Sequence, residues 1–288
     1  MSKSSPKHFS SLRNIKVLDS GGYDRDVVGA FLGIPSLTTL EYMGSGSREI
    51  SVLEPIKTPR VLGIQHLEID LSNTTVDDIS VIMSRSPNLR YLKATFNSDY
   101  TSIRPAPEPS FLPEFGEALR THAASQLEVL HVSLPRLMFS SADTAYCVGS
   151  LQELRNLREL TISLEDLIGR ATTRGLREGT TSLSGLDAQL PDSLQSIKLK
   201  IHLDQLYQSP YVLDQIELLL SSPILTRLRK LSVDFQLSYS NFGPVHYSRD
   251  VDDTEWDMPC AIDPFKHDRY DEFSYATIPL DPVYGYMW

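Results

Sequence analysis

The amino-acid sequence predicts an α/β fold, a solenoid with a curved, mostly parallel sheet and with helices or loops on its convex side. The first observation is residues 156–164, NLRELTISL, which space their apolar positions as L-x-x-L-x-I-x-L. Past the leading leucine, this is the period-2 alternation of a strand with one buried face. The second is that the pattern recurs along nearly the whole chain. One unit cannot bury its own apolar face, whereas stacked neighbours form a continuous core.

Seven further copies of the strand pattern are found. They are NIKVLDS (14–20), SLTTLEYM (36–43), IQHLEIDL (64–71), NLRYLKATF (88–96), QLEVLHVSL (126–134), SLQSIKLKI (193–201) and RLRKLSVDF (227–235). With Ile15 taken as the leading residue of the worn first copy, the leading apolar residues recur at intervals of 22 to 38 positions. The connecting segments therefore vary in length much more than the strands do.

The repeated unit resembles the leucine-rich repeat, which reads L-x-x-L-x-L-x-x-N/C-x-L. This chain departs from it after the strand, where only Asn97 falls at the asparagine position and Asn73 lies one residue late. The uneven spacing and the segments before the strands at 86–89 (SPNL) and 190–194 (LPDSL) are similar to the divergent repeats of fungal F-box and leucine-rich-repeat proteins. The resemblance covers roughly residues 14 to 235.

This resemblance implies non-catalytic recognition of another protein, with substrate recognition for an SCF-type ubiquitin ligase as one form of it. An F-box would be expected before the repeats, yet the first copy begins by Ile15. We therefore expect either a fragment or diverged product, or a protein that works without the ligase. A ligase adaptor that binds F-boxes would be a partner only if an F-box is supplied elsewhere. The alternatives are a scaffolding repeat protein without a ligase link and an enzyme with a loop-built site.

Three regions follow from the distribution of the repeats. Residues 1–13 form a polar N-terminal segment, 14–237 the irregular leucine-rich-repeat-like domain, and 238–288 an aromatic and acidic C-terminal cap or tail. A cap is expected because the last repeat would otherwise expose an apolar end and an unpaired strand edge. The alternative is a partly disordered segment that orders on a partner.

Composition excludes several classes of partner and location. The 288 residues carry a net charge of −10 that is spread along the chain, which disfavours binding to nucleic-acid phosphates. Cys147 and Cys260 form no C-x-x-C pair, so neither a disulfide framework nor a structural zinc site is indicated. No apolar run approaches the roughly 18 residues of a membrane span. We expect a cytoplasmic or nuclear protein with no membrane partner.

Apolar spacing at helical period predicts the elements between strands. Helices are expected at 23–34, between a cap at Asn73 or Thr74 and the closing Pro87, at 114–124, at 144–155 and at 211–220. The prolines of residues 97–113 favour an extended surface loop, either a docking loop or a tolerated insertion. Residues 44–47 (GSGS) favour a turn over a phosphate-binding loop. The segment with Arg170, Arg174 and Arg177 favours a solvated loop over an anion site.

No pattern of reactive residues predicts catalysis. The chain has no G-x-S-x-G motif, and its seven histidines are scattered singly. The acidic stretch 250–255 lacks the glycine and glutamate that an EF-hand loop needs at its sixth and twelfth positions. We therefore predict no catalytic residue, no metal site and no cofactor.

The outward positions of the strands predict a binding surface. The middle outward column would read Asp19, Glu41, Glu68, Lys93, His131, Thr161, Lys198 and Ser232, acidic at its start and basic later. Such a face offers rigidly placed side chains to a protein ligand, and graded charge orients encounter. The alternative is an ordinary solvated strand face. The predicted surface, centred on Glu68, Tyr91, Lys93, His131 and Glu159, comprises Glu41, His66, Glu68, Asp70, Tyr91, Lys93, His131, Glu159, Lys198, Lys200 and Lys230.

Overall fold

The computed structural model describes the repeat region and part of the C-terminal segment. The described residues are 11–19, 31–44, 61–70, 75–95, 111–133, 147–177, 185–203, 212, 215–237 and 245–250. Residues 45–47 of the predicted turn, most of the predicted helix at 23–34, and all of residues 251–288 lie outside them, and Gly44 ends a strand. Residues 31 and 32 are helical, and Leu32 is buried.

One open sheet contains every described strand, in the same order as in the chain. The strands are β1 (Asn14–Asp19), β2 (Thr39–Gly44), β3 (His66–Asp70), β4 (Tyr91–Thr95), β5 (Val129–Ser133), β6 (Glu159–Ser163), β7 (Ser196–Leu203), β8 (Lys230–Leu237) and β9 (Val245–Asp250). Neighbours from β1 to β8 pair in parallel, and β9 pairs antiparallel with β8. The predicted α/β class with a mostly parallel sheet is confirmed.

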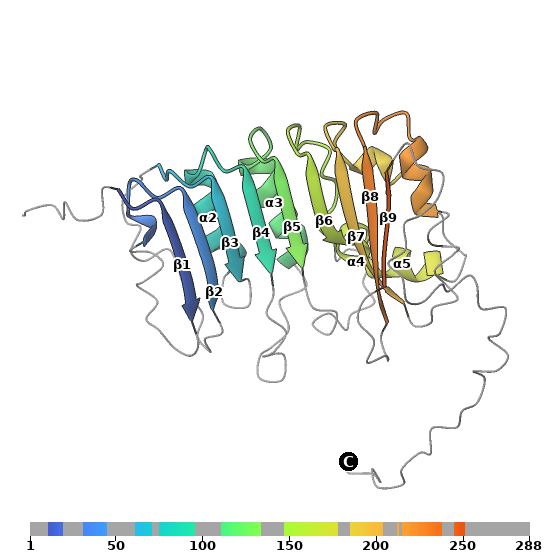
Figure 1. Ribbon diagram of the computed structural model, residues 1–288, viewed down its shortest axis with the longest axis horizontal. Helices are drawn as coiled ribbons and strands as arrows, with labels where there is room; N and C mark the ends of the chain where they lie inside the picture. The colour runs from blue at the N-terminus through green and yellow to red at the C-terminus, as the bar shows by residue number, and fades with distance from the viewer. Residues whose placement is uncertain are drawn as a thin grey trace, which may run out of the picture.

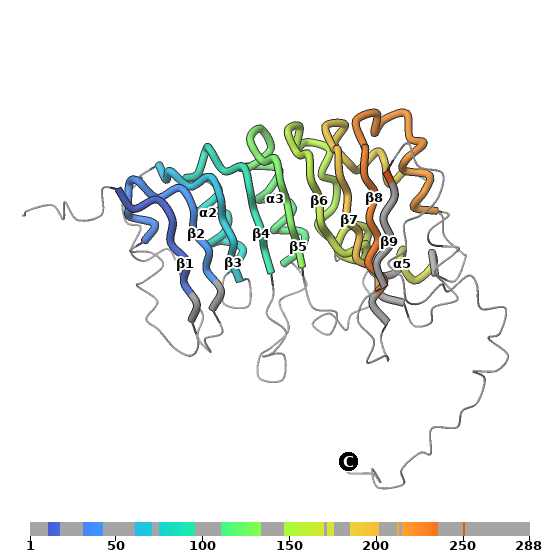
Figure 2. The backbone as a smooth tube through the Cα atoms, in the orientation of Figure 1, coloured from blue at the N-terminus to red at the C-terminus, as the bar shows by residue number. Residues whose placement is uncertain are grey.

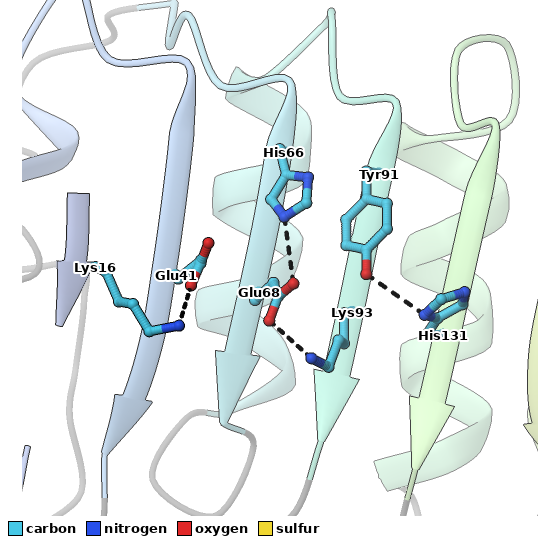
Figure 3. A network of polar contacts seen from close by, with 7 residues as sticks. All are labelled: Lys16, Glu41, His66, Glu68, Tyr91, Lys93 and His131. Atoms are coloured by element: carbon cyan, nitrogen blue, oxygen red, sulfur yellow. Dashed lines mark hydrogen bonds and ion pairs between the residues drawn. The ribbon is translucent and has the colours of Figure 1, made fainter. Parts of the chain in front are cut away.

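Helices cover one face of this sheet (Figure 1). They are α2 (Val76–Arg85), α3 (Phe111–His122), α4 (Leu164–Ile168) and α5 (Arg170–Arg177), with the 3-10 turns η5 (Asp187–Gln189) and η7 (Leu218–Ser221). In the described part of the chain no helix crosses the opposite face, which we call the open face (Figure 2). The open face carries the side chains of Glu41, Glu68, Lys93 and His131 (Figure 3). None of the described helices combines the length and apolar character that crossing a membrane requires.

The core consists of the inward positions of the strands. Leu67 on β3 pairs with Leu92 on β4, Leu92 pairs with Leu130 on β5, and all three are fully buried. The row continues through Leu160, Ile197 and Leu231, which are also buried. The predicted register of these strands is therefore confirmed.

The first copy of the repeat begins earlier than predicted. The carbonyl of Arg13 accepts hydrogen bonds from the backbone N–H groups of Thr38 and Thr39, as the carbonyl of Thr38 accepts them from residues 65 and 66. Arg13 is therefore the structural equivalent of Thr38, and the leading apolar residue is Leu12. Our choice of Ile15 was wrong. The first four positions of the pattern, L-x-x-L, are matched whether Leu12 or Ile15 is taken as the leading residue, so this spacing alone could not decide between them.

α2 is the predicted helix after β3, with a different cap. The side chain of Thr75 accepts a hydrogen bond from the N–H of Asp78, and the Asp78 carboxylate in turn accepts one from the N–H of Thr75. This reciprocal capping box satisfies two backbone donors of the first turn. The cap is thus Thr75, not Asn73 or Thr74.

α3 begins at Phe111, three residues before the predicted start. Pro113 lies in its first turn, where a missing N–H leaves no hydrogen bond unmade and the fixed φ suits a helix. The prediction that this proline excludes a helix was wrong for residues 111–113. Residues 97–110 of the predicted proline-rich loop lie outside the described part.

The described part of the predicted helix at 144–155 is not helical. Residues 147–155 form irregular backbone with turns at 152–153 and 155, and Gly149 adopts a φ of 77°. The guanidinium of Arg120 on α3 donates to the carbonyls of Val148 and Ser150 at 3.0 Å, so these oxygens bond across the fold and not along a helix. The apolar residues of this segment are nevertheless buried.

Two other connections differ from prediction in part. The arginine-containing segment predicted as a loop forms α5. In the segment 211–220, residues 212 and 215–217 are helical and lead into η7, which ends at Ser221. The C-terminal region contributes β9, which covers the edge of β8.

Gly116 should tolerate no side chain. A Cβ atom at this position would lie much closer to the Val148 carbonyl oxygen than van der Waals contact allows. Alanine in place of a helical glycine ordinarily stabilises by about 1 kcal/mol. We expect Gly116→Ala instead to lower the free energy of unfolding by about 1 to 3 kcal/mol, because α3 and the 147–150 segment must separate. Urea denaturation measures this, with Ser84→Ala on exposed α2 surface expected to change stability by less than about 0.5 kcal/mol. A more stable Gly116→Ala protein would contradict the packing described.

Candidate functional site

A row of polar side chains crosses the middle of the open face. Strand pairing places Lys16, Glu41, Glu68, Lys93, His131, Thr161, Lys198 and Ser232 side by side in that order. From Glu41 onward this is the predicted column. Its first member is Lys16 and not Asp19, because the first copy begins three residues earlier. The predicted charge gradient, with three acidic positions first, is therefore wrong.

Opposite charges on neighbouring strands form ion pairs along this face. Lys16 Nζ lies 2.6 Å from Glu41 Oε2, and Lys93 Nζ lies 2.8 Å from Glu68 Oε2 (Figure 3). In-register pairing makes such contacts possible, because side chains directly opposite each other are close together. The N-terminal half of the face thus presents two pairs of opposite charges and not a gradient.

Three rings lie beside these ion pairs (Figure 3). The rings of His66 and Tyr91 stack with centroids 3.9 Å apart and planes 4° from parallel. His131 meets Tyr91 edge-on, with centroids 5.5 Å apart and its Nδ1 3.4 Å from the Tyr91 hydroxyl. His66 Nε2 lies 3.4 Å from Glu68 Oε1, which joins the rings to the ion pair.

Partial burial and charge pairing shift the acid–base properties of this cluster. Burial alone would raise the pKa of Glu68, but the hydrogen bond and charge of Lys93, helped by His66, outweigh it and lower that pKa. Burial, followed by the nearby Glu68 carboxylate, raises the pKa of Tyr91. Burial lowers the pKa of His131. Glu68 is thus kept as a carboxylate, with Tyr91 and His131 favoured as neutral rings.

The structure brings six of the eleven predicted site residues into one cluster. We call Glu41, His66, Glu68, Tyr91, Lys93 and His131 the β2–β5 cluster. Lys16 on β1 extends this cluster. Sequence reasoning missed Lys16; taking the apolar Leu12 as the leading residue of the first copy would have placed Lys16 in the outward row. Asp70 is only 2 % exposed, so its prediction as part of an accessible surface was wrong.

The remaining predicted residues lie nearer the C-terminal end of the sheet. Lys198 pairs with Asp234 at 2.9 Å, and Lys200 donates to the Ser133 hydroxyl. Burial lowers the pKa of Lys200. Glu159 and Lys230 are exposed near the starts of their strands. These residues belong to the open face but not to the β2–β5 cluster.

One part of the cluster has donors that can hold a metal ion. Glu41, His66 and Glu68 each offer one ligand atom, and these atoms lie within 4.8 Å of one another. Sequence reasoning predicted no metal site because the three residues belong to two repeats and match no contiguous motif.

Comparison with known proteins gives no family for this chain. No protein-family model matches the sequence, and no curated protein is similar to it.

A second unusual group, Asp166, is buried on the helical side of the fold. It lies on α4, and its Oδ2 atom has no hydrogen-bond partner within the described residues. Burial, reinforced by the charge of Glu165, raises the pKa of Asp166 to about 8. The folded protein therefore favours the neutral acid at a pH where the unfolded chain is ionised.

Stability should fall with rising pH through Asp166. Its folded pKa of about 8 lies above the ordinary 3.8, so the folded state holds the extra proton between these values. The stabilisation that this proton gives the folded state is complete below pH 3.8. It is lost as the pH rises toward 8, at up to about 1.4 kcal/mol of unfolding free energy per pH unit. Asp166→Asn should remove this slope and stabilise the protein at neutral pH. Urea denaturation across the range tests this, with the exposed Asp192→Asn as control; an unchanged slope in Asp166→Asn would contradict it.

Proposed function

We propose that the chain is a leucine-rich-repeat-like solenoid whose open face binds another protein. The strands follow chain order, their leading apolar residues are buried from Leu37 onward, and each junction between parallel strands repeats the same backbone hydrogen bonds. These features support a stack of equivalent units. A sheet of this kind presents side chains from many strands to one ligand.

The observation that carries the proposal is the β2–β5 cluster. Its central ion pair is partly withdrawn from solvent, since the side chains of Glu68 and Lys93 are 16 % and 33 % exposed. Side chains already fixed by neighbours lose little conformational entropy when a partner binds. Aromatic groups beside oriented charges supply both contact area and specificity.

The resemblance to fungal F-box repeat proteins supports one version of this function. In that version the chain recognises substrates for an SCF-type ubiquitin ligase in the cytoplasm or nucleus, and the F-box is supplied elsewhere. The version without the ligase uses the same open face for a protein partner. The two differ only in whether the ligase adaptor is found with the chain.

Exchanging the central charges should weaken partner binding without unfolding the protein. The double variant Glu68→Lys/Lys93→Glu can still form an ion pair, but it presents the charges in reversed positions. We expect it to bind the partner at least about tenfold more weakly, because charge complementarity across an interface is reversed. Glu153→Lys, in an exposed turn outside the sheet, is the matched surface control and should bind normally.

Quantitative affinity purification from the native host measures this loss. A partner recovered with wild type and Glu153→Lys, but depleted with the double variant, is the expected result. Equal recovery with the double variant, shown by thermal unfolding to be folded, would remove the β2–β5 cluster from the binding surface. Recovery of the F-box-binding adaptor with wild type supports the ligase version, and its absence from a partner-containing complex contradicts that version.

A further inference from the structure

Three metal-ligand side chains converge at one position on the open face. His66 and Glu68 stand two residues apart on β3, so both side chains point to the same side of the sheet. Glu41 on β2 is the direct strand partner of Glu68. One imidazole nitrogen and one oxygen from each carboxylate thereby lie within 4.8 Å of one another (Figure 3).

The separation between two of the donors fits joint coordination better than a hydrogen bond. His66 Nε2 and Glu68 Oε1 are 3.4 Å apart, which is long for a hydrogen bond. A tetrahedral ion with bonds of about 2.0 to 2.1 Å places its ligand atoms about 3.3 Å apart. The other ligand atoms lie up to 4.8 Å apart, so small side-chain movements must bring them closer before all three can bind one ion. Glu41 can make them because 27 % of its side chain is exposed.

Neighbouring groups hold the donors but leave coordination capacity. The stacked Tyr91 ring fixes the plane of the His66 imidazole. Lys93 bonds to Glu68 Oε2, whereas Oε1 faces His66. Lys16 likewise bonds to one oxygen of Glu41, and a carboxylate has two. The lysines therefore orient the carboxylates and also reduce the net negative charge at the position.

We propose that Glu41, His66 and Glu68 bind a divalent transition-metal ion, with Zn²⁺ as the best match. One imidazole and two carboxylates suit zinc and similar first-row ions. Three protein ligands leave a fourth tetrahedral position open to water. The proposal does not depend on a protein partner, because all three ligands come from this chain.

Zinc titration of the full chain tests the site. Wild-type protein, first treated with a chelator and then freed of it, is titrated with Zn²⁺ in a calorimeter, in parallel with Glu41→Gln, His66→Gln and Glu68→Gln. We expect one equivalent to bind to wild type and each variant to bind at least about tenfold more weakly. His122→Gln removes a histidine at the end of α3 and should bind within about twofold of wild type.

Two further measurements separate specific binding from other outcomes. Thermal unfolding of each variant in chelator shows whether it is folded; if His66→Gln is not, Glu41→Gln carries the test. With Co²⁺ as the probe, wild type should show the intense visible absorption of a four-coordinate site, and Glu41→Gln should lose it. Wild-type binding no tighter than that of the triple variant Glu41→Gln/His66→Gln/Glu68→Gln would overturn the proposal.

Discussion

The register of the parallel sheet is the constraint on which the rest of this structure depends. Leu67, Leu92 and Leu130 lie side by side in the core, and each is fully buried. Because successive side chains of a strand alternate between faces, fixing this inward row also fixes the outward one. A slip of one residue would place Glu68 and Lys93 in the apolar interior, at a large cost in free energy. The β2–β5 cluster is therefore a geometric consequence of the leucine core.

The local sequence predicted correctly the strands and their buried faces, which depend on residues within one repeat. Leu160 and Ile162 alternate with polar neighbours, and that pattern was sufficient for strand, register and buried face. Long-range contacts decided one element that was predicted wrongly, the segment 147–155. Residues 147–155 are not helical, because Arg120 of another element bonds to their carbonyls and Gly149 takes a positive φ. No local pattern contains that information.

The candidate site was predictable as a set of positions but not as a set of contacts. Strand alignment placed Glu68, Lys93 and His131 in neighbouring rows. It did not reveal that His66 stacks on Tyr91, since that contact depends on the side-chain rotamers. Asp70 shows the opposite failure, because an outward position near the end of a strand can still be buried by what surrounds it. The alternation of side chains along a strand predicts the face to which each side chain points, whereas the burial of that side chain also depends on neighbours from other repeats.

The central claim is that the open face, and not the helical face, recognises another protein. Glu159 lies exposed on the open face, in the same outward row as Tyr91, and Thr121 lies exposed on α3. The most direct measurement places a photo-reactive amino acid at either position in the full chain, inside the native host, and identifies what becomes covalently attached. We expect a specific protein cross-linked from position 159 and not from position 121. Cross-linking of a specific protein only from position 121 would contradict this account.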